Sequence, residues 1–272
     1  RWPKAESAAA AWQRAAQIYA GRQDMANMAK YYEGLIQNFP KASPAALAEA
    51  HFLLGRAAFD QGDFKSSISH MAEAKTLDPQ KYGEQVNVLS VLSYHKLQDM
   101  NKLKEALETL QKENPSAVAR VPDVIPAWLG LQAYGMKDLE TADKYMTWAT
   151  QNDQLQNVKK VIWRNLAKVR LARRKYHRAL VASNNFLKDE DQPYRRADGM
   201  LDKASILLGL GKYADARKTA EDALALGVEG PLMASLKIVL GDISYAEKKF
   251  DEAAKHYGVT AELFVNDAEL KP

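Results

Sequence analysis

Apolar and small residues recur along the chain in the pattern of paired amphipathic helices. The three clearest segments begin at Phe52 (FLLGRAAFDQGDFKSSISHMAEAKTLDP), Ala204 (ASILLGLGKYADARKTAEDALALG) and Lys237 (KIVLGDISYAEKKFDEAAKHYG). Each predicts an apolar helix, a short turn of Gly, Lys or Asp, and a second helix that is rich in small residues. Apolar residues at i, i+3, i+4 and i+7 give such a helix one buried stripe, and no alternating strand pattern interrupts them. The chain is therefore predicted to be all-α.

The same unit repeats over almost the whole chain. An aromatic residue opens the second helix in four copies, at Phe64, Tyr176, Tyr213 and Phe250. Counted from these anchors, about seven copies begin near residues 9, 48, 84, 123, 160, 197 and 234. We therefore predict a single repeat domain over residues 1–272, built from helical hairpins.

A small residue recurs in the first helix of six copies, where the paired helices are expected to cross closely. These residues are Ala16, Gly55, Gly130, Ala167, Ala204 and Gly241, with Val91 as the bulky exception. Gly62 and Gly211 lie in the predicted turns, where a positive φ is often needed.

These residues resemble the tetratricopeptide repeat (TPR) family. That family has Trp, Leu, Gly or Ala and Tyr in the first helix, followed by Ala, an aromatic residue, Ala and a closing Pro. The matching residues are Trp12, Ala16, Tyr19, Tyr32 and Pro40 in the first copy, Leu54, Gly55, Phe64, Ala74 and Pro79 in the second, and Trp163, Leu166, Ala167, Tyr176 and Ala179 in the fifth. The resemblance implies a right-handed superhelical solenoid of about seven TPR-like hairpins.

Some copies depart from the family pattern. In the third copy, Asn87 and Ser90 stand where large apolar residues are expected, and the segment LQDMNKL lacks the turn glycine. In the sixth copy, Lys203 also occupies a usually apolar position.

A narrower resemblance lies in residues 31–64 (YYEGLIQNFPKASPAALAEAHFLLGRAAFDQGDF). This segment is similar to TPR modules of bacterial envelope proteins, of the TolA-binding and outer-membrane-assembly lipoprotein type. The resemblance favours the bacterial periplasm or envelope, with the cytoplasm as the alternative. Because the chain begins at Arg1 without Met, we expect it to be part of a longer protein.

Composition and motifs give no sign of catalysis. The chain has no Cys, so disulfides, thiolate metal sites and Cys nucleophiles are excluded. The five histidines (His51, His70, His95, His177 and His256) lie apart in the sequence, without a pair at i, i+4. Asp143 and Glu221 are interpreted as solvated helix charges. We therefore predict no enzyme, no metal, no cofactor and no small-molecule substrate, and no apolar run is long enough for membrane insertion.

By analogy with the TPR family, one stripe of first-helix residues is expected to line a concave face that binds protein or peptide. The candidate binding residues in this stripe are Phe52, Arg56, Phe59, His95, Tyr134 and Tyr245. The alternative for the aromatic residues is core packing between neighbouring hairpins. Gln13 and Gln17 do not reproduce the Lys and Asn with which some family members clamp a chaperone terminus, so no chaperone clamp is expected.

The positive charge is concentrated in one segment. Residues 157–178 hold nine of the 38 Lys and Arg residues and no Asp or Glu, while the net charge of the chain is +4. Lys160, Arg164 and Lys168 recur every four residues and share one helix face. Two interpretations stay open, a solvated face balanced by the acidic residues 189–191 or a binding site for an acidic segment of a partner.

The predicted function is a non-catalytic protein- or peptide-binding scaffold. The alternative is a helical-repeat nucleic-acid binder that uses the basic fifth copy. This alternative is disfavoured because the expected groove is mainly apolar and aromatic elsewhere, whereas RNA-reading repeats present polar side chains to the bases.

Overall fold

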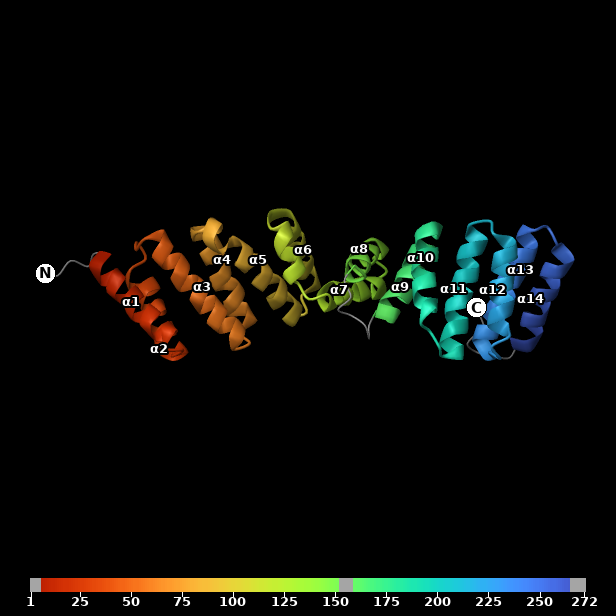
Figure 1. Cartoon of the computed structure of the whole chain (residues 1–272), viewed down its shortest axis with the longest axis horizontal. Helices are drawn as coiled ribbons and strands as arrows, with labels where there is room; N and C mark the ends of the chain where they lie inside the picture. Colours follow the sequence, from red (N-terminus) through yellow and green to blue (C-terminus); the bar gives the residue numbers. More distant parts are fainter. Residues whose placement is uncertain (1–5, 152–158, 265–272) are drawn as a thin grey trace. The chain divides into compact units, whose positions relative to one another are not determined.

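The computed structural model describes residues 6–151 and 159–264, and it divides the chain into two compact units, Arg1–Pro122 and Asp123–Pro272. In the described residues, fourteen α-helices and one 3-10 helix follow one another without a strand (Figure 1). The all-α prediction is therefore confirmed. The expectations of a single domain and of a right-handed superhelical twist stay predictions.

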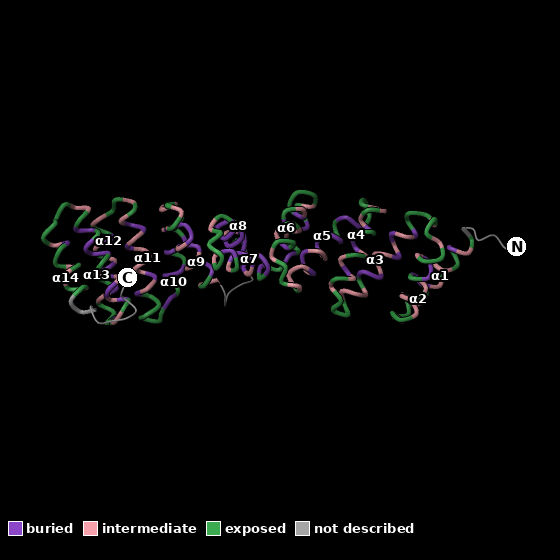
Figure 2. The backbone as a smooth tube through the Cα atoms, turned by 180° about the vertical axis from the view of Figure 1, so that it is seen from behind, coloured by how far each residue is buried: buried purple, intermediate pink, exposed green. Residues whose placement is uncertain are grey.

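The first unit contains three helical hairpins and a short 3-10 helix. Its elements are α1 (Glu6–Gly21), α2 (Met25–Asn38), α3 (Pro44–Asp60), α4 (Phe64–Leu77), α5 (Pro79–Lys96), α6 (Met100–Glu113) and η1 (Pro115–Arg120). α1 packs mainly on α2 and α3 mainly on α4, whereas α5 packs on both α4 and α6, so that each hairpin also packs on the next. In Figure 2 the buried positions follow the helix faces that meet, and exposed positions collect at the turns.

The second unit contains four hairpins of the same kind. Its helices are α7 (Val124–Gly135), α8 (Leu139–Ala149), α9 (Lys159–Ala172), α10 (Tyr176–Lys188), α11 (Pro193–Gly209), α12 (Tyr213–Leu224), α13 (Gly230–Ala246) and α14 (Phe250–Phe264). Together the two units hold seven hairpins in the described residues, as the repeat count predicted.

All seven hairpin turns share one left-handed residue. Gly62 has φ 83° and Gly211 has φ 73°, so the prediction for these two glycines is confirmed. The same turn position has positive φ in the other five copies, where it is occupied by Gln23, Gln98, Lys137, Arg174 and Lys248. The turn is therefore imposed by hairpin packing even where the residue has a Cβ that disfavours it.

An Asp follows the left-handed residue in the first four copies and caps the second helix. In each case its carboxylate accepts a hydrogen bond from the backbone N–H three residues later. These residues are Asp24, Asp63, Asp99 and Asp138. Such a cap satisfies one of the unpaired donors at a helix start.

The small residues of the first helices lie where the paired helices touch. A Cβ on Gly130 would lie 2.9 Å from the backbone nitrogen of Met146, and one on Gly241 would lie 2.4 Å from the ring of Tyr257. Ala16, Ala167 and Ala204 are buried. The prediction of close helix crossings at these positions is confirmed.

Candidate functional site

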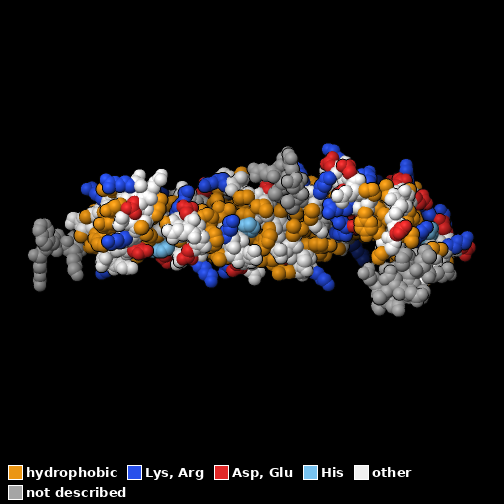
Figure 3. Space-filling view, turned by 90° about the horizontal axis from the view of Figure 1, so that it is seen from below, with side chains coloured by type: hydrophobic (Ala, Val, Ile, Leu, Met, Phe, Trp, Pro, Cys, Tyr) orange, Lys and Arg blue, Asp and Glu red, His pale blue; other side chains and the backbone are white. Residues whose placement is uncertain are grey.

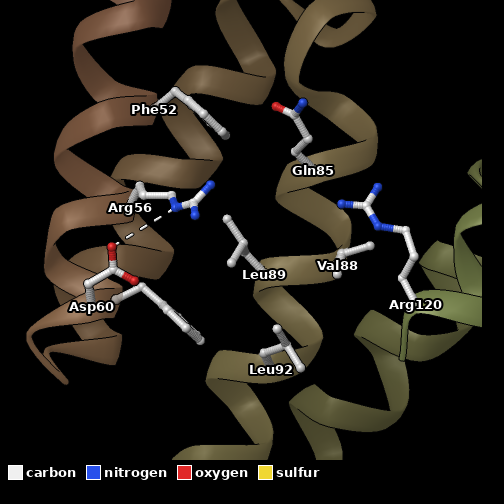
Figure 4. Close-up of a pocket in the computed structure, with 9 residues that line it drawn as sticks. Phe52, Arg56, Asp60, Gln85, Val88, Leu89, Leu92 and Arg120 are labelled. Carbon is white, nitrogen blue, oxygen red and sulfur yellow. Dashed lines mark ion pairs between the residues drawn. The ribbon is translucent and has the colours of Figure 1, made fainter. Parts of the chain in front are cut away.

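A cavity of about 390 Å³ lies in the first unit on the faces of α3 and α5 (Figure 4). It is lined by Phe52, Arg56, Phe59, Asp60, Gln85, Val88, Leu89, Leu92 and Arg120. Three of the predicted binding residues (Phe52, Arg56 and Phe59) are therefore brought together, because positions three or four apart share one helix face. We call this cavity the α3–α5 groove.

The two phenylalanines of the α3–α5 groove are partly packed and partly exposed. The ring of Phe52 stacks on that of Tyr82 with centroids 4.6 Å apart, and Phe59 meets Phe64 edge to face at 5.4 Å. Both phenylalanines are half-buried, as are Leu89 and Leu92. Each ring thus has one side anchored in the repeat, which holds its other side in a defined position toward the cavity.

Two arginines flank the apolar floor of the groove. Arg56 and Arg120 lie on either side of Val88 and Leu89 (Figure 4). Arg56 Nε is 4.0 Å from Asp60 Oδ2, and Arg120 donates to Glu84 at 2.6 Å; all four side chains are about half exposed or more. Exposed pairs of this kind contribute little stability, so both guanidinium groups can exchange these partners for a ligand carboxylate.

The other predicted first-helix residues do not line this groove. His95 is half-buried in the last turn of α5, and burial lowers its pKa. Tyr134 packs against the core of the second unit, which agrees with the alternative that the aromatic residues of this stripe belong to the core. Tyr245 is 62% exposed and meets Phe250 edge to face at 5.5 Å.

The cations of α9 are bound within the chain. Lys160 donates to the backbone carbonyl of Asp189, Arg164 pairs with Asp198, and Lys168 Nζ lies 3.8 Å from Asp202. On the face shown in Figure 3, Lys and Arg side chains are interspersed with Asp and Glu. The interpretation of α9 as a solvated cationic face is therefore corrected, and the role of its cations in partner binding stays a prediction.

One carboxylate at this face has an unusual proton affinity. Burial raises the pKa of Asp202 to about 6, although Lys168 and Arg164 oppose the rise. The spacing of these acids is visible in the sequence, since Asp198 and Asp202 are four residues apart on α11, as Arg164 and Lys168 are on α9.

The remaining cations of the basic segment surround Asp143. Arg170 Nε donates to its carboxylate at 2.9 Å, Arg173 at 3.0 Å and Lys175 at 2.9 Å. Burial opposes ionisation of Asp143, but the hydrogen bonds from Lys175 and Arg170 outweigh it and hold its pKa below the ordinary value. The interpretation of Asp143 as a solvated charge was wrong, because its side chain is only 8% exposed.

Two of the histidines form a pair that the sequence spacing did not reveal. His51 on α3 and His70 on α4 lie with their Nδ1 atoms 3.0 Å apart, although they are nineteen residues apart in the sequence. Burial lowers the pKa of both rings. Within the part of the chain that the structure describes, no group of three or more His, Asp and Glu residues is placed to hold a metal ion.

Two stretches of the chain match a known family of helical repeats. The pattern of the tetratricopeptide repeat family matches residues 45–82 and 201–261, which contain α4, α12 and α13, nearly all of α3, the start of α5, the second half of α11 and most of α14. The chain therefore contains tetratricopeptide repeats in these two segments. Proteins built from TPRs are in general non-catalytic scaffolds that bind other proteins.

Several solved structures are similar to the chain. The structure of Naa15/Naa10 bound to HypK-THB has a TM-score of 0.55 at 14% identity, over 96% of this chain and 38% of that chain. The TPR chain thus spans little more than a third of that chain's length. PilF from Pseudomonas aeruginosa has a TM-score of 0.42 at 18% identity, over 82% of this chain and 94% of that one. A TPR protein from Parabacteroides merdae has 0.42 at 15%, over 96% and 95%.

No curated protein sequence matches the TPR chain. Among its described helices, none combines the length and apolar character needed to cross a membrane.

Proposed function

We propose that this TPR chain is a scaffold whose α3–α5 groove binds a peptide segment of another protein through an apolar side chain and a nearby carboxylate. The observation that carries the proposal is the cavity of about 390 Å³, with half-buried aromatic and aliphatic walls between two exposed arginines. A cavity of this size accepts one or two large side chains and leaves the rest of the ligand on the surface.

The two kinds of residue have different roles in this proposal. Burial of apolar surface against Phe52, Phe59 and Leu92 supplies most of the affinity. Arg56 and Arg120 fix the orientation of the segment and raise the rate of association with an acidic ligand, and salt screens their contribution.

A test begins with peptides selected against the whole chain from a random library of twelve-residue peptides. The double variant Phe59→Ala and Arg56→Glu is expected to weaken the selected peptides at least tenfold in calorimetric titrations. Lys65→Glu, an exposed residue of α4 outside the groove, is the matched control and should leave the affinity unchanged. Peptides that bind the double variant as tightly as the unmodified chain would place the binding surface elsewhere.

Two further expectations, about the cellular setting and about nucleic-acid binding, are separate from this proposal. The bacterial envelope setting stays a prediction from the resemblance of residues 31–64. Nucleic-acid binding by the fifth copy has no observation in its favour, because Arg164, Lys168 and the cations around Asp143 have oxygen partners within the chain.

A further inference from the structure

The hairpins have a second set of recesses on the side away from the first-helix groove. Each recess, here called an outer slot, is enclosed by the second helix of one hairpin and by both helices of the next. The fifth residue of the second helix points into the slot in every copy compared below. In α8 and α12 that residue is charged, Asp143 and Arg217 respectively.

Charged clusters fill two of these outer slots. Asp143 meets Arg170, Arg173 and Lys175 from the next hairpin. Two slots further along the second unit, among α12, α13 and α14, the charges are reversed. There Arg217 pairs with Glu247 at 2.7 Å and with Glu252 at 2.6 Å. The clusters occupy equivalent repeat positions, so the same slot is closed by ionic contacts in both cases.

Two other outer slots are open. A cavity of about 240 Å³ lies among α4, α5 and α6, and one of about 360 Å³ lies among α10, α11 and α12. The fifth residue of the second helix is apolar here, Ile68 in the first case and Leu180 in the second, and each lines its cavity.

A missing leucine explains why these two slots are open. The residue before the small crossing residue of the first helix is a buried leucine in four copies, at Leu54, Leu129, Leu166 and Leu240. In the two copies with open slots the equivalent residues are Ser90 and Lys203, and both line the cavities. Both are among the departures from the family pattern seen in the sequence, and each removes a large apolar side chain from between the hairpins.

The α10–α12 slot combines an apolar floor with a positive rim. Leu180 and Leu207 form the floor, and Lys203 lies one helical turn before Leu207 on the same side of α11. The rim carries the three lysines Lys203, Lys212 and Lys218.

The ammonium groups of this rim are not neutralised locally. Among the described residues, no carboxylate lies within 4.0 Å of any of the three. The cavity is lined by only two acids, Asp215 and Asp222, so cations are in excess. Lys203 is also half-buried, and a charge removed from water without a counter-ion is destabilising. A carboxylate supplied by a ligand would relieve this cost.

We propose that the α10–α12 slot is a second docking site, which binds an acidic segment of a partner protein with one leucine-sized side chain on Leu180 and Leu207 and carboxylates on the lysine rim. The site lies in the second unit and is separate from the α3–α5 groove. Charge complementarity selects this occupant, since the open slot lacks both the apolar volume of a leucine and the negative charge that its rim needs.

Lys203→Leu tests the proposal without weakening the fold. This change gives the sixth copy the leucine that four other copies bury at the same position, so the melting temperature should stay equal or rise. The probe is a fluorescein-labelled twelve-residue peptide with one central Leu flanked on both sides by Asp and Glu. Fluorescence polarisation should show saturable binding to the unmodified chain, and Lys203→Leu should weaken it at least tenfold.

Three controls make the result specific to the slot. Lys188→Leu, an exposed residue at the end of α10, should leave the affinity unchanged, as should the groove variant Phe59→Ala and Arg56→Glu. Probes with Ala in place of Leu, or with Lys in place of the acids, should bind at least tenfold more weakly. Lys218→Glu on the exposed rim should also weaken binding, and it provides a second variant that leaves the helix interface intact.

Several outcomes would overturn the proposal. These are no saturable binding, equal binding by Lys203→Leu, or binding lost in the groove variant instead. Sedimentation of the unmodified chain as a dimer that Lys203→Leu dissociates would also overturn it, because the occupant of the slot would then be a second copy of the chain.

Discussion

Replacing Asp143 should be among the most destabilising single changes in the second unit. Its carboxylate lies between α8, α9 and the turn before α10, and three cations donate to it at 2.9–3.0 Å. Asp143 and Arg170 are each only 8% exposed at the side chain. In Asp143→Leu, the guanidinium of Arg170 would remain buried with Thr147 Oγ1 and a backbone carbonyl as its only acceptors among the described residues.

The size of the effect follows from burial. Removing one partner of a buried ion pair typically costs about 3–5 kcal/mol, because the other charge is left without compensation. Arg173 and Lys175 are more exposed and can turn to water, so they add little to this cost. We therefore expect Asp143→Leu to lower the free energy of unfolding by about 3 kcal/mol or more.

The repeat supplies its own rescue. One copy later, the positions of Asp143 and Arg170 are occupied by Leu180 and Leu207. The double variant Asp143→Leu and Arg170→Leu reproduces that apolar pair, and replacing a buried ion pair by packed apolar residues is often neutral. The double variant should therefore be more stable than Asp143→Leu alone.

Urea denaturation followed by circular dichroism at pH 7 measures these differences. Glu140→Ala, an exposed residue of the same helix, is the control and should change the stability by less than about 0.5 kcal/mol. The reasoning is refuted if Asp143→Leu costs less than about 1 kcal/mol, or if the effects of the two leucine substitutions simply add.

Three further predictions concern packing and pH. Gly130→Ala should lower the free energy of unfolding by about 1–3 kcal/mol in thermal unfolding, because its Cβ would meet the backbone of the facing helix. Gly83→Ala, with open space around its Cβ, should instead raise the free energy of unfolding by about 0.5–1 kcal/mol. Burial lowers the pKa of His51 and His70, so the unfolded chain binds protons more readily and stability should fall as the pH drops below about 6.5; His70→Gln should flatten that dependence in urea titrations at pH 8 and pH 5.5. The pKa of Asp202 is raised to about 6, so its ionised form destabilises the folded state, and Asp202→Asn should raise the melting temperature more at pH 8 than at pH 5. Equal effects at the two pH values would contradict either titration argument.

The repeat architecture was predictable from local patterns in the sequence. Helix periodicity, small residues at the crossings and turn glycines are requirements that each hairpin imposes on its own residues. The same reasoning placed Phe52, Arg56 and Phe59 on one face of α3, because residues three and four apart in a helix are neighbours whatever surrounds them. Ser90 and Lys203 also stand out in the sequence as departures from the family pattern. The sequence does not show that each of them lines a cavity between hairpins.

The tertiary structure decided what those patterns leave open. The basic segment is concentrated in the sequence, yet its partners Asp143, Asp198 and Asp202 come from neighbouring repeats, so only the packing of hairpins shows that its charge is compensated. Whether an aromatic residue lines a groove or joins the core depends in the same way on the helix that faces it, as Tyr134 shows. Local sequence determines each helix and its faces, whereas charge pairing and cavities depend on side chains that are one repeat apart in the chain and meet only when hairpins stack.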